Sequence, residues 1–537
     1  MFTQIDAVVV GAGFSGMYML HSLREAGFSV RVYEAGDNVG GVWHWNRYPG
    51  ARCDSESIYY NYTFSQELLQ EWTWSSRYPA QPEILSYLNY VADKFNLRQD
   101  IQFNTRITAA HYDETNSRWK IQTDDGNILL AKYFITGVGC LSTTNIPSFK
   151  GLNSFKGECY HTGSWPHEQV DFKGKRVGVI GNGSTGIQAI PVIAKEAEHL
   201  FTFQRTPQYS QPAKNHSLDS EFLRKTKENY REIAQQMRDS SYGVPAISPT
   251  RSALEVTPEE RERIFEKVWE TGGSLFGSFN DIAINEEANK TVAEFVRSKI
   301  QQIVRDPKVA EKLMPSYYYG TKRPIKDTDY FETFNRENVT LVNVKQDPIV
   351  EITPNGIRTE EAEYELDVIV FATGYDAITG TLLKIDICGR DGLSLKEKWA
   401  NGAQVKTYLG IANSGFPNMF MITGPESPSA FSNAPVSIEQ HVEWITECIL
   451  QLRENGVETI EANVEAEEAW SKHCREVADA TLFTKTDSWY TGANIDGKPR
   501  AFSIYLGGVG TYRQKCNEVA ANGYEGFSLM SSKSTVV

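Results

Sequence analysis

Two glycine-rich turns, 170 residues apart, constrain the fold of this chain more than any other feature. The first, Gly11-Ala12-Gly13-Phe14-Ser15-Gly16, follows the apolar run of residues 7–10 and opens a segment of helical periodicity. A strand, a G-x-G-x-x-G turn and a helix form the dinucleotide-binding βαβ unit, whose glycines let the backbone approach a pyrophosphate. Glu34 lies 23 residues after Gly11, where an acid accepts hydrogen bonds from a ribose hydroxyl. We therefore predict that Gly11, Gly13, Gly16 and Glu34 bind the adenosine half of FAD.

The second turn, Gly181-Asn182-Gly183-Ser184-Thr185-Gly186, also lies between an apolar run, residues 176–180, and a helical pattern. Its ribose position is Gln204 rather than an acid, and Arg205 and Thr206 follow. A guanidinium pairs with a 2′-phosphate that a carboxylate would repel, so this site is predicted to select NADP over NAD. The alternative is that Arg205 is an ordinary surface residue at a strand end.

Two dinucleotide sites of different ribose chemistry predict an α/β fold with two Rossmann-like domains, one for FAD and one for NADP. Charged sequence of helical period separates the second turn from the strand that ends in Ala372-Thr373-Gly374, which predicts a helical insertion in the second domain. The predicted ranges are 1–145 and 380–537 for the FAD-binding domain, 150–215 and 325–379 for the NADP-binding domain, and 216–324 for the insertion.

Composition limits which classes of partner the chain is expected to bind and which compartment it is expected to occupy. The chain carries 54 Lys and Arg against 68 Asp and Glu, and this net charge of −14 argues against binding to nucleic acid or to an anionic membrane. Seven cysteines without a C-x-x-C pair, together with an N-terminus that lacks a signal pattern, indicate a reducing cytoplasm and no metal centre. The sequence leaves the oligomeric state open, a monomer included.

Two further stretches resemble the signatures of one enzyme family. Residues 155–166 contain Phe155, Gly157, His161, Thr162 and Trp165-Pro166, which match the pattern F-x-G-x-x-x-H-T-x-x-W-P. Residues 40–54 match the pattern G-G-x-W-x-x-x-x-Y-P-G-x-x-x-D. Both patterns are those of Baeyer–Villiger monooxygenases. The resemblance implies an enzyme that uses FAD, NADPH and O₂ to convert a ketone into an ester or lactone through a C4a-peroxyflavin.

The resemblance also implies roles for particular residues. Arg323 would be catalytic over the flavin and Asp54 would orient it, while the loop of residues 424–433 would line flavin and substrate. The residues implied for FAD are Ser15, Glu34, Val42, Trp43, His44, Trp45, Asp54, Tyr60, Ile107 and Ala434. The residues implied for NADP are Arg52, Cys53, Asp54, Asn182, Gly183, Ser184, Thr185, Gly186, Ile187, Gln188, Arg205, Thr206, Lys322, Arg323 and Trp489.

Several alternatives stay open. His161 is either a contact that links the two domains, a packed core histidine, or a residue of the mechanism. A flavin-dependent N- or S-oxygenating enzyme would share both dinucleotide sites, and so would a non-catalytic flavoprotein that senses NADPH. A flavin disulfide reductase is excluded, because no cysteine pair lies near the flavin turn. The sequence does not distinguish linear, cyclic and aryl ketones.

Overall fold

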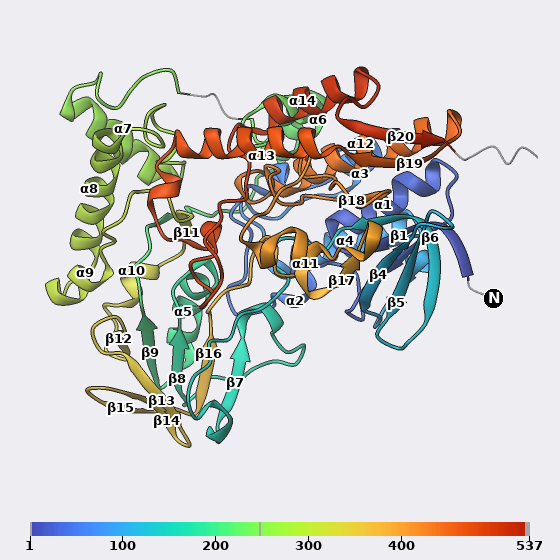
Figure 1. Cartoon of the computed structure of the whole chain (residues 1–537). Helices are drawn as coiled ribbons and strands as arrows, with labels where there is room; N and C mark the ends of the chain where they lie inside the picture. Colours follow the sequence, from blue (N-terminus) through green and yellow to red (C-terminus); the bar gives the residue numbers. More distant parts are fainter. Residues whose placement is uncertain (1–2, 246–248, 532–537) are drawn as a thin grey trace, which may run out of the picture.

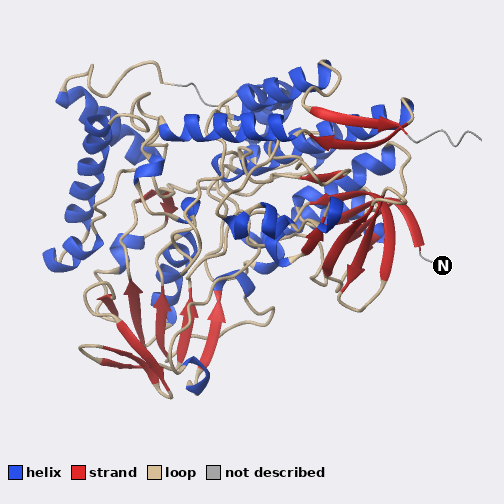
Figure 2. Ribbon diagram, viewed as in Figure 1, coloured by secondary structure: helices blue, strands red, loops and turns tan. Residues whose placement is uncertain are grey.

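The computed structural model describes residues 3–245 and 249–531. Residues 1–2, 246–248 and 532–537, which fall inside the predicted domain ranges, lie outside the described residues. The described strands gather into two large sheets that lie apart from each other, with helices around and between them (Figures 1 and 2). Within the described ranges, every helix lacks either the length or the apolar character needed to cross a membrane.

The first sheet has the order β17-β4-β5-β6-β1-β2-β3, with β18 beside β6. Its strands are β1 (Thr3–Val10), β2 (Val30–Tyr33), β3 (Ile101–Gln102), β4 (Ile107–Asp113), β5 (Arg118–Thr123), β6 (Ile128–Thr136), β17 (Asp386–Cys388) and β18 (Met419–Met421). Strand β1 pairs in parallel with β2 and β6, and its residues Ala7, Val8 and Val9 are fully buried. A central parallel strand covered on both faces explains the apolar run that the sequence places there.

The helices of this first unit come from both ends of the chain. They are α1 (Phe14–Glu25), α2 (Val42–Trp45), α3 (Gln66–Glu71), α4 (Gln81–Lys94), α11 (Leu395–Lys398), α12 (Ala434–Glu454), α13 (Val464–Asp479) and α14 (Val509–Ala521). Helices α1 and α12 pack against each other and share one core with β1 and β2. After residue 380 the chain returns to the first sheet through β17, β18 and α12. The discontinuous FAD-binding domain with its predicted bounds stays a prediction.

The second sheet is wholly parallel, in the order β12-β9-β8-β16-β7. Its elements are β7 (Glu158–His161), β8 (Arg176–Ile180), α5 (Ser184–Glu196), β9 (His199–Gln204), α10 (Tyr330–Thr333), β12 (Val339–Asn343) and β16 (Val368–Phe371). Smaller ladders are formed by β10 (Ser210–Pro212) with β11 (Ile325–Asp327), by β13 (Ile349–Thr353), β14 (Gly356–Thr359) and β15 (Glu363–Glu365), and by β19 (Val457–Ala462) with β20 (Phe527–Ser531). Two Rossmann-like units, as predicted, make up the fold.

The predicted insertion contains α6 (Ser220–Asp239), α7 (Pro258–Thr271), α8 (Glu286–Ile303) and α9 (Pro307–Leu313). Helices α7, α8 and α9 lie beside the second unit, at the left of Figure 1, and share its core. Helix α6 instead packs on α3 and α14 of the first unit, because its buried Met237 clusters with Val436 and Val509. The insertion therefore contacts both units rather than the second alone, and the domain boundaries themselves stay a prediction.

Candidate active site

The first glycine-rich turn joins β1 to α1 as predicted. A Cβ atom on Gly16 would lie 1.7 Å from the carbonyl oxygen of Gly11, so only glycine permits this close turn. Gly13 is the N-cap of α1 and no side chain caps the helix. The N-terminal amides of α1 are thus placed to meet a pyrophosphate, which fits the dinucleotide predicted here.

Glu34 follows β2 and is buried beside this turn. Its carboxylate accepts hydrogen bonds from the backbone N–H groups of Ala12 and Gly36, both at 2.7 Å. These bonds fix the carboxylate at the mouth of the turn, and a carboxylate retains further acceptor positions for a ribose hydroxyl. The geometry suits the predicted ribose contact, which stays a prediction.

The second turn repeats the arrangement between β8 and α5. A Cβ atom on Gly183 would meet open space, and no side chain caps α5. The amide of Asn182 donates to Gln204 Oε1 at 2.8 Å, which ties the turn to the end of β9. Ser184, Thr185, Gly186, Ile187 and Gln188 form the first turns of α5. This cradle also fits a dinucleotide pyrophosphate.

Two cations stand at the ribose end of the second cradle. Arg205 is exposed directly after β9, and Thr206 follows it. Burial, and secondarily the charge of Arg205, lower the pKa of the Lys322 ammonium. Like charges kept close to one another favour an anionic ligand, because the ligand removes their repulsion. The pair therefore supports a 2′-phosphate at this position.

The signature loop of residues 40–54 docks onto the second unit. Tyr48 donates a 2.6 Å hydrogen bond to Gln188 Oε1, and Gln188 Nε2 donates to the carbonyl of Arg52 at 3.1 Å. Gly50 has φ +82°, and a Cβ atom there would lie 2.4 Å from the carbonyl oxygen of Gln188. Helix α5 thus anchors a loop that belongs to the first unit, and this contact brings Asp54 to the junction of the two units.

Arg323 and Asp54 form the ion pair that the family resemblance implies. Arg323 Nε donates to Asp54 Oδ2 at 2.7 Å and Nη2 donates to Oδ1 at 2.9 Å. Nη1 donates to the carbonyl of Ala430 at 3.2 Å. Burial alone would raise the pKa of the Asp54 carboxyl, but the guanidinium outweighs it and holds that pKa below the ordinary value. The Asp54 charge raises the pKa of Arg323, so the guanidinium stays charged.

Aromatic side chains adjoin this pair. Trp489 begins a short 3₁₀ turn and packs on Tyr490, with ring centroids 4.2 Å apart. Phe431 packs on Tyr490 at 4.6 Å. The charge of Arg323 partly counters the rise that burial causes in the Tyr490 pKa, which places the phenol beside the guanidinium. The arrangement puts a permanent cation against an apolar wall.

Other residues implied for cofactors are mostly buried. Trp43 donates to Tyr60 Oη at 3.1 Å within the first core, and the Cys53 thiol is buried. Ile107 lies in the core on β4, and Ala434 begins α12. Val42, His44 and Trp45 belong to α2. The roles of these residues toward FAD or NADP stay predictions.

His161 is a buried residue of the fingerprint. It ends β7 and is buried, its Nδ1 accepts from the backbone N–H of Gly163 at 2.9 Å, and burial lowers its pKa to about 4. Next to it, the hydroxyls of Thr162 and Thr185 lie 2.9 Å apart. The backbone N–H of Trp165 donates to the carbonyl of Trp45 at 3.2 Å. The fingerprint therefore contacts the first unit through Trp165, while His161 itself is buried and bonded within its own segment, so its role stays a prediction.

Comparison with known proteins decides the family. Residues 5–211 match the family model described as flavin-binding monooxygenase-like. The chain is 49% identical over 524 residues to a Baeyer–Villiger monooxygenase of Pseudooceanicola batsensis, which covers 97% of this chain and 95% of the relative. The chain belongs to the Baeyer–Villiger monooxygenase family.

Two other family relatives bear on cofactor and chemistry. The structure of an oxidized steroid monooxygenase bound to NADP superposes with a TM-score of 0.94, at 48% identity and covering 99% of this chain and all of the other. A phenazine N-monooxygenase of Lysobacter antibioticus is 44% identical over 540 residues, covering the whole of this chain and 99% of the relative. As in its family, FAD and NADP are the cofactors of this enzyme, and both dinucleotide cradles fit them.

Sequence reasoning missed one buried acid near the site. Glu426 lies in the loop 424–433, is 3% exposed and has φ +65°. Burial raises the pKa of its carboxyl to about 7. The only signal in the sequence is an acid within an otherwise small and apolar loop, which alone predicts a solvated residue.

Proposed function

We propose that this chain uses NADPH and O₂ to convert ketones into esters or lactones. One observation carries the proposal: a bidentate ion pair places Arg323 where the signature loop, the second unit and the loop 424–433 meet. Bound FAD, once reduced by NADPH, supplies the activation of O₂. The chain supplies binding, orientation and a fixed charge.

The fixed charge is the chemical task of Arg323. Asp54 and Ala430 engage three of the five N–H groups of the guanidinium within the described part of the chain, and the Tyr490 hydroxyl also lies within hydrogen-bond reach, so at most two donors remain for an anionic oxygen. An arginine cannot lose its proton at physiological pH, even in a poorly hydrated site. Preorganised donors aimed at developing negative charge are among the largest contributions to catalysis. Arg323 is therefore assigned to stabilise charge at the substrate carbonyl oxygen.

Asp54 and the aromatic wall support that charge. The two carboxylate oxygens of Asp54 fix the plane of the guanidinium, so that little reorganisation is needed when substrate charge develops. Tyr490 lies beside the guanidinium and packs on Trp489 and Phe431, so Arg323 has an aromatic neighbour on one side. Arg205, Thr206 and Lys322 are assigned to the 2′-phosphate of NADPH.

A second candidate function is N-oxygenation, favoured by the similarity to the phenazine N-monooxygenase. An amine or aromatic nitrogen attacks an electrophilic oxygen and develops positive charge, so a fixed guanidinium at the reacting centre would oppose that reaction. The Arg323–Asp54 pair thus supports ketone oxidation over N-oxygenation. It also argues against a non-catalytic NADPH sensor, which would not need a cation held in this way.

The test is a two-stage experiment. NADPH is first added without O₂, and bleaching of the flavin reports reduction. O₂ is then admitted with linear, cyclic or aryl ketones or with a phenazine, and products are identified by mass. Insertion of one oxygen atom into a ketone supports the proposal, whereas N-oxide formation without ester or lactone supports the second candidate.

We place the enzyme in the cytoplasm because all seven cysteines are free thiols.

A further inference from the structure

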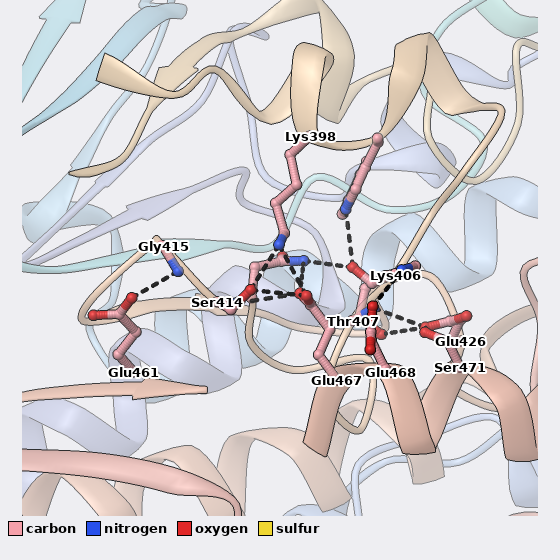
Figure 3. A network of polar contacts seen from close by, with 12 residues as sticks. Lys398, Lys406, Thr407, Ser414, Gly415, Glu426, Glu461, Glu467, Glu468 and Ser471 are labelled. Carbon is pink, nitrogen blue, oxygen red and sulfur yellow. Dashed lines mark hydrogen bonds and ion pairs between the residues drawn. The ribbon is translucent and has the colours of Figure 1, made fainter. Parts of the chain in front are cut away.

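Glu426 belongs to the loop whose Ala430 carbonyl accepts a hydrogen bond from Arg323, and it connects this loop to Thr407 and to helix α13. Its Oε2 accepts hydrogen bonds from the backbone N–H of Thr407 at 2.8 Å and from the Ser471 hydroxyl at 2.8 Å. The Thr407 hydroxyl lies 3.0 Å both from this oxygen and from the carbonyl of Pro425, and its single proton can serve one of them at a time. Figure 3 shows this carboxylate together with Thr407 and with Ser471 of α13. A carboxylate that accepts from two separate segments of the chain is a strong structural anchor.

The backbone of Glu426 is held as firmly as its side chain. Its N–H donates to the carbonyl of Ser503 at 2.8 Å, and its carbonyl accepts from Trp470 Nε1 at 3.1 Å. The residue adopts φ +65°, a left-handed conformation that is unfavourable for a non-glycine residue. Burying a carboxylate adds a further cost unless it is well hydrogen bonded. A residue that only filled space would carry neither cost, so the position calls for a more specific role.

The loop that Glu426 anchors makes a hydrogen bond to Arg323. The chain runs from Glu426 through Ser427, whose carbonyl accepts from the N–H of Tyr505 at 3.0 Å, into the 3₁₀ turn Ser429–Phe431. In this turn the carbonyl of Ala430 accepts the 3.2 Å hydrogen bond from Arg323 Nη1. Asp54 fixes the other edge of the guanidinium. The loop between Glu426 and Phe431 therefore sets one of the two supports of Arg323.

We propose that Glu426 is a positioning residue, which fixes the 424–431 loop to α13 and thereby holds the Ala430 carbonyl against Arg323. The inference rests on the proposed function, because its effect is read through ketone oxygenation. Glu426 does not touch Arg323 and acts only through the loop. An error of about 1 Å in a catalytic group can cost on the order of 10²-fold in rate.

The same helix provides a matched control. Glu467 of α13 is also buried, and it accepts from Lys398 at 2.8 Å, from the backbone N–H of Ser414 at 3.1 Å and from the Ser414 hydroxyl at 2.8 Å. Figure 3 shows this second network beside the Glu426 junction. Its partners lie on α11 and on the loop before β18, not on the 424–431 loop. Loss of Glu467 should therefore destabilise the fold without moving Arg323.

The experiment compares the holoenzyme with its Glu426→Ala, Glu426→Gln and Glu467→Ala variants. Measured for each are the melting temperature, the rate of flavin reduction by NADPH without O₂, and the ratios of ester and hydrogen peroxide formed to NADPH consumed. In Glu426→Ala we expect ketone oxygenation to fall by roughly 10- to 100-fold, with peroxide in place of ester and reduction within a few-fold of native. Glu426→Gln keeps one acceptor oxygen and should recover part of the coupling, while Glu467→Ala should lower the melting temperature and stay coupled.

Different failures point to different conclusions. Full coupling in Glu426→Ala, or equal uncoupling in Glu426→Ala and Glu467→Ala, overturns the positioning role. If Glu426→Ala does not fold, Ser471→Ala removes one donor from the carboxylate and must show partial uncoupling for the proposal to stand. If the native enzyme oxygenates no ketone, the proposed function fails and this inference fails with it.

Discussion

Selection of NADPH over NADH is predicted to depend on Arg205. A charge-assisted hydrogen bond contributes about 1.5–3 kcal/mol, so Arg205→Ala would weaken NADPH by roughly 10- to 150-fold if Arg205 acted alone. Arg205 does not act alone, because Lys322 is a second cation nearby. Burial, and after it the charge of Arg205, lower the pKa of the Lys322 ammonium. Removing Arg205 relieves Lys322 of that repulsion and leaves a better cation for the phosphate. The expected loss is therefore near the lower end, about 10- to 30-fold.

The assay is steady-state NADPH and NADH oxidation with a fixed ketone, supported by titration of the oxidised coenzymes. The KM for NADPH should rise while that for NADH changes by less than about twofold. Lys195→Ala removes an exposed cation from the end of α5 and serves as the control, with no change in either coenzyme. Equal losses for NADPH and NADH, or no loss for NADPH, would refute the assignment of Arg205 to the 2′-phosphate.

Two further predictions concern buried carboxylates. Glu34→Ala removes the acceptor beside the first turn, so the variant should purify with less than one FAD per chain by absorbance, and full occupancy with native affinity would contradict the ribose contact. Burial raises the pKa of Glu439 to about 7, above its ordinary value, so its protonated form stabilises the fold at low pH and this contribution is lost as pH rises through 7. Relative to Glu439→Gln, the free energy of unfolding of the native protein should fall by about 3 kcal/mol between pH 4.5 and 8. The difference in melting temperature between the two proteins should therefore change with pH, and a constant difference would show that Glu439 stays ionised.

Much of the fold could be predicted because its signals are local. Each glycine-rich turn carries its strand before it and its helix after it, and Gly16 is required by a backbone contact within the same turn. The packing of α6 could not be predicted in this way. Its apolar residues indicate a helix with one buried face. That face packs against Val436 and Val509, which lie far along the chain, so local sequence does not predict the contact.

The candidate site also contains residues that the sequence alone predicts and residues that it does not. Arg205 follows from its place after a strand, whereas Asp54 and Arg323 are 269 residues apart and only the family resemblance pairs them. Glu426 could not be predicted, since its burial depends on α13 covering the loop. Helix α13 does show buried Glu467, Trp470, Ser471 and Cys474 at helical spacing, a face too polar to identify as core from sequence alone.

The central claim is that Arg323 stabilises charge on the reacting substrate rather than only binding coenzyme. The most direct measurement is the two half-reactions of Arg323→Ala, compared with Lys322→Ala. The account predicts that Arg323→Ala still binds NADPH and reduces flavin, while ketone oxygenation falls by about 10²–10³-fold, equivalent to ~3–4 kcal/mol, and peroxide replaces ester. Lys322→Ala should weaken NADPH yet oxygenate ketone normally at saturating coenzyme. If Arg323→Ala instead behaves as predicted for Lys322→Ala, Arg323 is a coenzyme-binding residue and the catalytic assignment is wrong.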